Sequence, residues 1–329
     1  MTFCFEIRFF YLHIVLNMSF QNSSIEVTEF LIGGFDTIGR PMGVGVVILI
    51  TYLIATLANI VNIVLIICDK RLHKPMYLLI CNLAVVDILN TSSTSPTIIG
   101  VLLVGVNTIS YVPCLMQMFS LHLAAVMEMF ALAVMAFDRL LAVSYPFQYQ
   151  SYLTNVRTLL LIYLVWIVAC SFVAVMPATV LPLPHCSSKL KYIYCDYAAI
   201  IRTTCADPTY YFNMISIISF FLLFFTFIFI CLSYFWIIVF VKLSSNSDKR
   251  KMGSTCLSHF IVVICYYCPL FIRIILTRLG VVLSLDEWNG LMIGSILGPS
   301  LVNPFIYCLR TKEMRYKIFQ IFKKVQTSQ

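Results

Sequence analysis

The sequence carries very little charge. Only 11 % of its 329 residues are Asp, Glu, Lys or Arg, whereas soluble domains carry about a quarter. A chain with 61 % hydrophobic residues and so few charges cannot build a surface that faces water on all sides. This shortage excludes a soluble globular domain. It predicts a protein that crosses a membrane many times, with lipid against its outer faces.

The signatures of enzymes and transporters are also missing. The sequence has no metal-ligand spacing, no Gly-rich phosphate loop, and no nucleophile and base at one membrane depth. His259 lies next to Ser258, but both fall at the inner end of an apolar stretch, where helix packing explains them better. The chain has no internal repeat, and its intramembrane charges are too few for a transport relay. These absences argue against an enzyme and against a transporter.

What the chain does have is seven long apolar stretches. Each is long enough to cross the hydrocarbon core, which takes about 20 helical residues. We therefore predict an all-α membrane protein, a bundle of seven transmembrane helices, with spans near residues 42–67, 76–103, 115–137, 158–180, 210–241, 255–277 and 288–309. Packed transmembrane helices tolerate proline, so we expect kinks rather than breaks at Pro96, Pro177, Pro269, Pro299 and Pro304.

The basic residues predict the orientation. With the N-terminus outside, the inner segments hold 15 of the 22 Lys and Arg residues but only 4 of the 14 acids. Because Lys and Arg gather on the cytoplasmic side, this distribution favours an outside N-terminus and a cytoplasmic C-terminus in the plasma membrane. The net charge of +8 then belongs to the inner face, where anionic membrane lipid is a sufficient partner and nucleic acid is not needed.

These spans divide the chain into three parts: an extracellular segment, 1–41, a seven-span domain, 42–309, and a cytoplasmic tail, 310–329. Residues 1–17 resemble no good signal peptide, and we expect an upstream start codon before Met18; a poor signal anchor is the alternative. Asn17 and Asn22 begin glycosylation triplets that only an outside N-terminus could use. In the tail, residues 312–325 predict an amphipathic helix along the inner leaflet, with a disordered tail as the alternative.

The cysteines indicate a stapled outer loop. Of the 13 Cys, eight lie in predicted spans or on the cytoplasmic side, where thiols stay reduced. Apart from Cys4 near the N-terminus, the remaining four are predicted outside: Cys114, Cys186, Cys195 and Cys205. Four cysteines allow three pairings, and the sequence alone does not choose between them. The loop after the fourth span is long enough to predict a lid over the bundle.

Four ordered segments carry a resemblance to a known family. They are LHKPMYLLICNLAVVD at 72–87, MAFDRLLAVSYPFQY at 135–149, KMGSTCLSHFIVV at 251–263 and PSLVNPFIYCLRTKEMR at 299–315. They resemble the signature motifs of the olfactory (odorant) receptors, a family of rhodopsin-like G-protein-coupled receptors. The resemblance covers about residues 25–320. Departures from the motifs, which point to the receptors of aquatic vertebrates, occur at Phe137, Leu140, Ser144, Met252, Gly253, Cys268 and Pro269.

The resemblance implies a function and two disulfides. A receptor of this family binds a small odorant and activates a heterotrimeric G protein of the stimulatory olfactory type, which raises cyclic AMP. By position, it also implies the pairs Cys114–Cys195 and Cys186–Cys205. The alternative is another rhodopsin-like receptor, for a non-odorant small molecule or a peptide.

An acid–arginine pair stands where the third apolar stretch ends. We expect Asp138 to neutralise Arg139 at the cytoplasmic boundary while the bundle is closed, although a plain topological anchor would also fit. The resemblance makes the pair a switch, whose release of Arg139 lets the sixth helix swing out. It also implies that Tyr234 and Tyr307 receive Arg139 in the open state, and that Tyr307 belongs to a motif with Asn303 and Pro304.

Two acids, Asp87 and Glu128, fall inside predicted spans. Buried carboxylates are costly, so they are normally paired or bound to a cation. Family position places both near Asn59 and Asn303, and a sodium ion held between them is one hypothesis. A shared proton and a purely structural polar network are the alternatives. Apart from this ion, we expect no cofactor.

The resemblance also implies an apolar ligand cavity in the outer half of the bundle. A cavity with few polar groups suits a small, partly hydrophobic ligand. No acid occupies the outer half of the third span, and His122 either bonds the ligand or a neighbouring helix. Arg273 could attract an acidic ligand or extend to the interface. The cavity is predicted to be lined by Met118, Leu121, His122, Ala125, Val126, Tyr267, Leu270, Phe271, Ile274 and Ile293.

Overall fold

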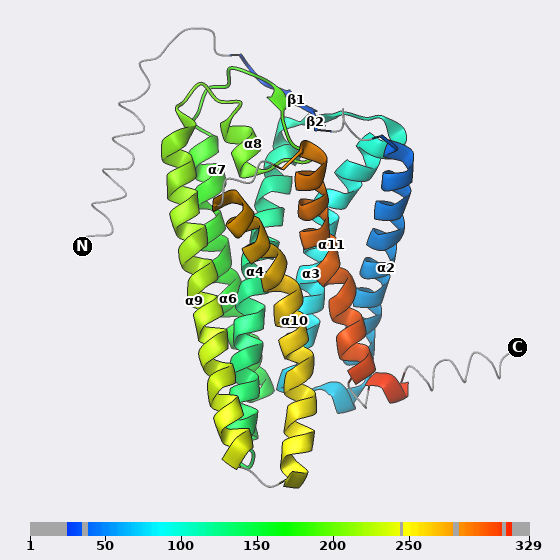
Figure 1. Cartoon of the computed structure of the whole chain (residues 1–329), viewed down its shortest axis with the longest axis vertical. Helices are drawn as coiled ribbons and strands as arrows, with labels where there is room; N and C mark the ends of the chain where they lie inside the picture. Colours follow the sequence, from blue (N-terminus) through cyan, green and yellow to red (C-terminus); the bar gives the residue numbers. More distant parts are fainter. Residues whose placement is uncertain (1–24, 35–38, 244–245, 279–282, 311–313, 318–329) are drawn as a thin grey trace, which may run out of the picture.

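The computed structural model describes residues 25–34, 39–243, 246–278, 283–310 and 314–317, and most of them are helical. Within these residues, seven helices are long and apolar enough to cross a membrane. They stand side by side as one bundle, with small strands at one end (Figure 1). The predicted all-α bundle of seven spans is therefore confirmed. The spans are Pro41–Cys68, Pro75–Val104, Tyr111–Ser144, Asn155–Val180, Pro208–Lys242, Cys256–Leu276 and Leu285–Cys308.

The helices that make these spans are labelled in chain order. The long ones are α2 (Pro41–Cys68), α3 (Pro75–Ile99), α4 (Tyr111–Ser144), α6 (Asn155–Val173), α9 (Pro208–Leu243), α10 (Asn246–Arg278) and α11 (Leu285–Arg310). A π-helix, η2 (Gly100–Val104), extends α3, and the short α7 (Val175–Val180) extends α6. The connections contain η1 (Lys70–Leu72), α5 (Tyr149–Tyr152) and α8 (Tyr197–Ile201).

Local sequence signals explain where several helices begin and end. Pro41 and Pro75 occupy the first turns of α2 and α3, where the missing N–H of proline costs no hydrogen bond. The hydroxyl of Thr154 caps α6 by accepting a hydrogen bond from the backbone N–H of Arg157. Gly105 ends η2 with a φ of 79°, a left-handed conformation that glycine adopts without steric cost.

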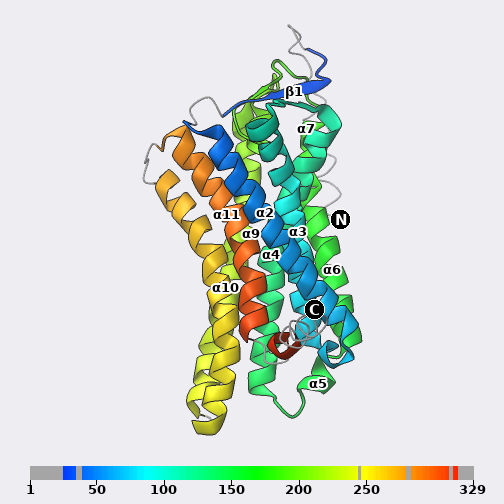
Figure 2. The same cartoon turned by 90° about the vertical axis from the view of Figure 1, so that its right-hand side faces the viewer.

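Helix α4 runs through the middle of the bundle and is the most buried of the spans (Figures 1 and 2). The outer helices instead expose large apolar side chains, such as Ile217, Phe221 and Phe225 on α9. A hydrocarbon surface of this extent fits contact with lipid rather than with water.

A small sheet covers the end of the bundle that carries the lid, which we define as residues 181–207 between α7 and α9. Its strand order is β2–β1–β3, with β1 (Glu29–Ile32) in the centre, antiparallel to β2 (Thr108–Ser110) and parallel to β3 (Lys189–Leu190). Phe30 of β1 is fully buried, and its ring packs on those of Tyr111 and His185. The segment before the first span is therefore part of the lid structure.

The structure corrects the end of one predicted span. The third, expected at 115–137, runs to Ser144, so Arg139 lies inside α4 and does not end it. The reason is that the apolar residues Leu140 to Val143 continue the helix beyond the charged pair. The fourth span, expected at 158–180 with a kink at Pro177, is found at Asn155–Val180. It changes from α6 to α7 at Ala174, three residues before Pro177, whose ring cannot continue a regular hydrogen-bond ladder.

Other predictions fall on residues that the structure does not describe. Residues 1–17 and the glycosylation triplets at Asn17 and Asn22 lie outside the described ranges. Of the predicted tail helix, only residues 314–317 are described, and they are helical. The division into 1–41, 42–309 and 310–329 and the amphipathic tail remain predictions.

Candidate functional site

The acid–arginine pair lies at the end of the bundle opposite the lid. A guanidinium N–H of Arg139 donates to Asp138 Oδ2, and the hydroxyl of Tyr149 in α5 donates to Asp138 Oδ1 over 2.5 Å. Only 1 % of Asp138 and 9 % of Arg139 is exposed. Both carboxylate oxygens are therefore occupied, and the buried charges neutralise each other.

Tyr149 remains a hydrogen-bond donor at physiological pH. Burial raises the pKa of its phenol, and the nearby Asp138 carboxylate raises this pKa further because it opposes a phenolate. The sequence did not reveal this third member of the cluster. Its only signal is a Tyr in the segment that follows the pair.

The two tyrosines predicted to receive Arg139 have other partners in this structure. The Tyr234 hydroxyl donates to the Cys256 carbonyl over 3.1 Å and lies 2.8 Å from His259 Nδ1, which ties α9 to α10. The Tyr307 hydroxyl lies 3.9 Å from Met135 Sδ on α4. Both tyrosines are close enough to Arg139 to interact with its charge. At the end of the bundle opposite the lid, these two tyrosines therefore contact α10 and α4 and make no hydrogen bond to Arg139 among those found.

The two intramembrane acids lie together between α3, α4 and α11. Asn303 Nδ2 donates to both Asp87 oxygens, over 3.1 and 3.2 Å. Neither Glu128 oxygen, nor Asn303 Oδ1, has a hydrogen-bond partner among the described residues, and Glu128 interacts electrostatically with Asp87. The unpartnered oxygens of Glu128 and Asn303, with the Asp87 carboxylate beside them, form a donor set that fits a hard cation such as sodium.

The predicted ligand residues separate into two groups. Met118, Val126 and Tyr267 belong to the main core, against which Leu270, Phe271 and Ile274 pack. Leu121 and Ile293 instead belong to a second cluster, in which α2, α3, η2 and α11 meet the lid. Ala125 lies on α4 where its carbonyl accepts a hydrogen bond from Tyr266 over 2.8 Å.

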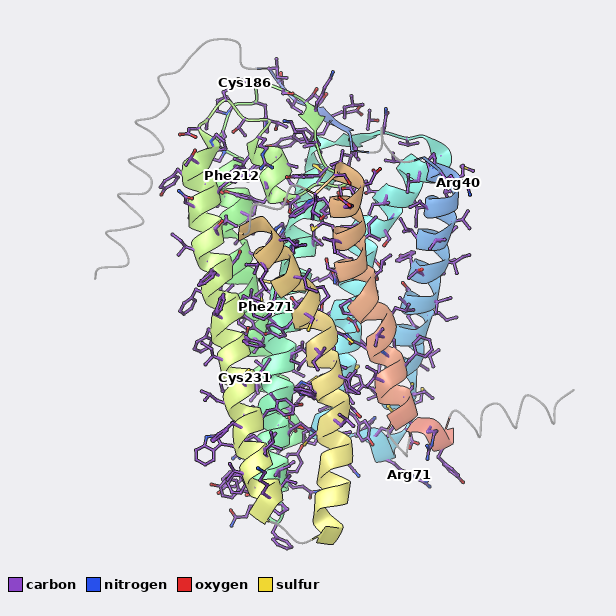
Figure 3. The ribbon with its side chains drawn as sticks, viewed as in Figure 1. Arg40, Arg71, Cys186, Phe212, Cys231 and Phe271 are labelled. Carbon is purple, nitrogen blue, oxygen red and sulfur yellow. A yellow bond between two sulfur atoms is a disulfide. The ribbon has the colours of Figure 1, made fainter. Side chains whose placement is uncertain are left out.

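Tyr267 is at the centre of an aromatic group between α9 and α10. Its hydroxyl donates to Thr226 Oγ1 over 2.8 Å, and its ring packs 5.3 Å from that of Phe227. Phe271 lies one helical turn further along α10, between the two helices (Figure 3), 4.8 Å from Phe227. A rotation of α10 would therefore break contacts that α9 makes with these rings.

The contacts found for His122 are with its own helix and with the lid, whereas a ligand or a neighbouring helix was the expected partner. Its Nδ1 lies 2.8 Å from the Met118 carbonyl on its own helix. Its Nε2 lies 3.4 Å from Asp196 Oδ1 in the lid. An acid thus reaches the outer half of α4 from the loop, which a search of the span alone could not find.

Two disulfides staple the lid. The structure contains Cys114–Cys195, which joins the start of α4 to the lid, and Cys186–Cys205, within the lid. Beside the first bond, the buried Gln117 accepts a hydrogen bond from the Cys195 N–H over 2.7 Å and donates to the Ser93 carbonyl and Thr97 Oγ1. The sequence analysis missed Gln117. A polar residue one turn after Cys114 in an apolar helix was the available signal.

Seven spans, a stapled lid and a buried charge pair at the opposite end define a seven-helix membrane receptor. The family model for "Olfactory receptor" matches residues 48–325. The human Olfactory receptor 13G1 is 31 % identical over 307 residues, covering 92 % of this chain and 98 % of the relative. The human Olfactory receptor 51E2 is 32 % identical over 286 residues, covering 85 % and 88 %. The chain belongs to the olfactory receptor family, which consists of G-protein-coupled receptors and not of enzymes.

Proposed function

We propose that this protein is an odorant receptor of the plasma membrane with its N-terminus and lid outside. It binds a small, partly hydrophobic molecule in the outer half of the bundle and activates a heterotrimeric G protein of the stimulatory olfactory type, which raises cyclic AMP. The excess of Lys and Arg in the segments opposite the lid supports this orientation. The family membership supports the rest.

The cavity is proposed to lie beneath the lid, among α4, α9, α10 and α11. Most of the side chains predicted to line it are apolar or aromatic, which suits a ligand with few polar groups. Tyr267 supports a role for this cavity in signalling because its hydroxyl and ring join α10 to α9. A ligand that changes these contacts would shift α10, and Pro269, two residues after Tyr267, provides a place for that helix to bend.

The observation that carries the proposal is the buried charge pair at the opposite end. Arg139, which is 9 % exposed, is held by the Asp138 carboxylate, which itself accepts a hydrogen bond from Tyr149. When these contacts open, Arg139 needs new partners, and Tyr234 and Tyr307 lie within range of its charge. The pair therefore has the properties of a two-state element that a ligand can bias.

A docking surface for the G protein adjoins this pair. Phe147, in the connection between α4 and α5, is fully exposed, with a relative exposure of 101 %. A large apolar side chain at a water-facing loop suits a contact with a partner protein. Phe147 is two residues before Tyr149, so a partner that moves Phe147 would also disturb the hydrogen bond from Tyr149 to Asp138.

A sodium ion between Asp87 and Glu128 is part of the proposal. The carboxylates and Asn303 Oδ1 would hold it, and the ion would compensate the buried negative charge. A shared proton is the alternative. If sodium stabilises the receptor and this effect depends on Glu128, the result favours the bound ion over the shared proton.

The test is a ligand panel read out as cyclic AMP in cells that display the receptor. The Arg139→Ala variant should reach the cell surface in normal amounts but give no cyclic AMP response. The reason is that it lacks the guanidinium that is proposed to change partners on activation. Arg71→Ala, which removes an exposed arginine at the same end, should respond normally. An unchanged response of Arg139→Ala would contradict the proposed mechanism. Failure of odorants combined with a response to a circulating ligand would favour a non-odorant receptor.

A further inference from the structure

We infer that His185 is an acid-sensitive latch. At neutral pH its imidazole holds the N-terminal segment, residues 25–34, against the lid and α4, and in acid it releases that segment. The N-terminal segment contains β1. Because the lid covers the proposed ligand cavity, the latch makes the cover of that cavity sensitive to the pH outside the cell. This last step rests on the proposed function, whereas the latch itself does not.

The imidazole of His185 lies where the N-terminal segment, the lid and α4 meet. Its ring centroid is 5.5 Å from that of Phe30 in β1 and 5.6 Å from that of Tyr111 at the start of α4. The rings of Phe30 and Tyr111 stack on each other at 5.7 Å. His185 is 6 % exposed and Phe30 is fully buried. One lid side chain therefore completes an aromatic group to which all three parts contribute.

The two sides of the latch are attached with different strength. On the lid side, the Cys186–Cys205 disulfide follows His185, and the Cys186 N–H donates to the Thr203 carbonyl over 2.8 Å. The N-terminal segment is attached without a covalent bond: the Ile25 N–H donates to the His185 carbonyl over 2.8 Å. If the imidazole leaves its place, the lid side stays fixed, and the N-terminal segment is the part that detaches.

The hydrogen bonds of Thr203 determine the tautomer of His185. Thr203 Oγ1 donates to the Ile200 carbonyl over 2.7 Å and lies 2.9 Å from His185 Nδ1. Because the hydroxyl has a single proton, which the carbonyl accepts, Nδ1 must be the donor in the second contact. In the neutral ring Nε2 then has only a lone pair, and it is buried without a hydrogen-bond partner among the described residues. A second proton would create a buried N–H without an acceptor and a buried charge.

The surroundings of His185 offer no charge that would compensate this proton. The titratable group in contact with the ring is the Tyr111 phenol. Burial is the one cause found, within the described part of the chain, for the pKa of His185, and it lowers this pKa below the ordinary value of 6.5. The charged side chains of the N-terminal segment and the lid therefore leave this pKa to burial: Glu26, Glu29, Lys189, Lys191, Asp196, Arg202 and Asp207.

The sign of the pH dependence follows from the lowered pKa. When the N-terminal segment is released, the imidazole meets water and regains its ordinary pKa, so the released state binds a proton more readily than the closed one. The closed state is therefore most stable above pH 6.5, loses stability as the pH falls through that value, and stops losing it below the lowered pKa. Carboxylates titrate near pH 4 (about 3.9–4.3). A comparison of pH 7.5 with pH 5.5 thus separates the histidine from the acids.

Hydrogen exchange of the full receptor in nanodiscs tests the latch, without ligand or G protein. The amides of Ile25, Leu31 and Ile32 report release, because they donate to the lid or to the segment before β2. After correction for intrinsic rates, we expect these amides to exchange about threefold or more faster at pH 5.5 than at pH 7.5. The imidazole signal of His185, followed by NMR, should titrate below pH 6.5.

Two variants remove the titration in different ways. His185→Phe keeps a ring between Phe30 and Tyr111 and has no proton to bind. His185→Asn loses the ring but keeps an N–H for Thr203 Oγ1, and its missing NMR signal identifies that of His185. In either variant the corrected exchange should be equal at the two pH values. His122→Asn is the matched control, because His122 is the other histidine described near the lid, and it should keep the full acid effect.

The outcomes separate the latch from the proposed function. Equal exchange at the two pH values in the unaltered receptor, or an acid effect that survives in both His185 variants, would overturn the latch. A pKa of His185 above 6.5 would also overturn it, since it would mean that the aromatic faces stabilise the cation. Each of these results leaves the odorant receptor intact. A receptor that is silent to every odorant would contradict the proposed function and leave the latch standing.

Discussion

The side-chain carbonyl of Gln117 accepts a hydrogen bond from the backbone N–H of Cys195 over 2.7 Å. Its amide nitrogen donates to the Ser93 carbonyl and to Thr97 Oγ1 on α3, each over 2.7 Å. One buried amide thus joins α3, α4 and the lid beside the Cys114–Cys195 bond. The disulfide ties the lid to α4, and Gln117 ties the lid to α3 as well.

Replacing Gln117 by Leu should therefore destabilise the receptor. The variant loses three hydrogen bonds and leaves the buried Cys195 N–H without its partner, at a cost of about 2–4 kcal/mol. Thermal unfolding of the purified protein in nanodiscs measures the effect as a drop of several degrees. Gln150→Leu, at an exposed position, is the control. Equal unfolding temperatures for the two variants would show that Gln117 does not hold the lid.

Removing the Tyr149 hydroxyl should raise signalling without ligand. In Tyr149→Phe, Asp138 loses the donor to its Oδ1, so the closed state loses a hydrogen bond that the open state need not make. We expect basal cyclic AMP at equal surface level to increase by about twofold or more, a shift of a few tenths of a kcal/mol or more. Tyr145→Phe, at an exposed tyrosine five residues after Leu140, should leave basal signalling unchanged. Lower basal activity in Tyr149→Phe would argue that the hydroxyl supports the active state.

Sodium should stabilise the receptor through Glu128. Ion binding at about ten times its dissociation constant adds about 1.4 kcal/mol to the folded state, which appears as a higher unfolding temperature in sodium than in choline. Glu128→Gln keeps the side-chain shape but removes the charge and should abolish the difference. A sodium effect that persists in this variant would exclude Glu128 as a ligand. No sodium effect in either protein would favour the shared proton.

The ion pair between Lys317 and Asp69 should hold the short helix after α11 against the first connection. Lys317 Nζ lies 2.9 Å from Asp69 Oδ2, and this hydrogen bond, followed by that from the Arg71 N–H, lowers the pKa of Asp69 below its ordinary value of 3.8. Because the folded-state pKa is depressed, the contribution is complete above the ordinary value and disappears as the pH falls through the depressed one.

Hydrogen exchange of residues 314–317 tests this contact. Lys317→Gln should accelerate exchange at pH 7, and the difference from the unaltered receptor should vanish at acidic pH after correction for intrinsic rates. Lys70→Gln, at an exposed lysine of the same connection, is the control. A difference that stays constant down to pH 3 would mean that Lys317 acts through packing of its alkyl chain and not through the carboxylate.

The spans were predictable because a residue that faces lipid must have an apolar side chain. Apolar runs of sufficient length indicated all seven helices, and Lys and Arg indicated the expected orientation. The end of α4 was wrong because hydropathy places a boundary at the first charge, whereas the Asp138–Arg139 pair neutralises itself and the helix continues. A hydropathy scale assigns a value to each residue separately, so it cannot recognise that two neighbouring charges neutralise each other.

The contact between Asp138 and Arg139 was expected from the sequence, whereas the ligand residues came from the resemblance, and their role remains a prediction. Residues whose contacts join distant parts of the sequence were missed. Asp196 lies in a loop, and its relation to His122 depends on how the disulfide directs the lid. Tyr149 and Gln117 likewise acquire their roles from partners on other elements. Spacing in one sequence does not encode such contacts.

The central place of β1 has a consequence for biosynthesis. Leu31 pairs with Thr108 on one side and with Lys189 on the other, so the earliest of the three strands to be synthesised waits for both neighbours. The sheet can close only after the ribosome has delivered four helices and the segment that follows them. Until then the buried Phe30 has no complete enclosure, and a nascent chain stalled at this stage would expose it to the quality-control machinery.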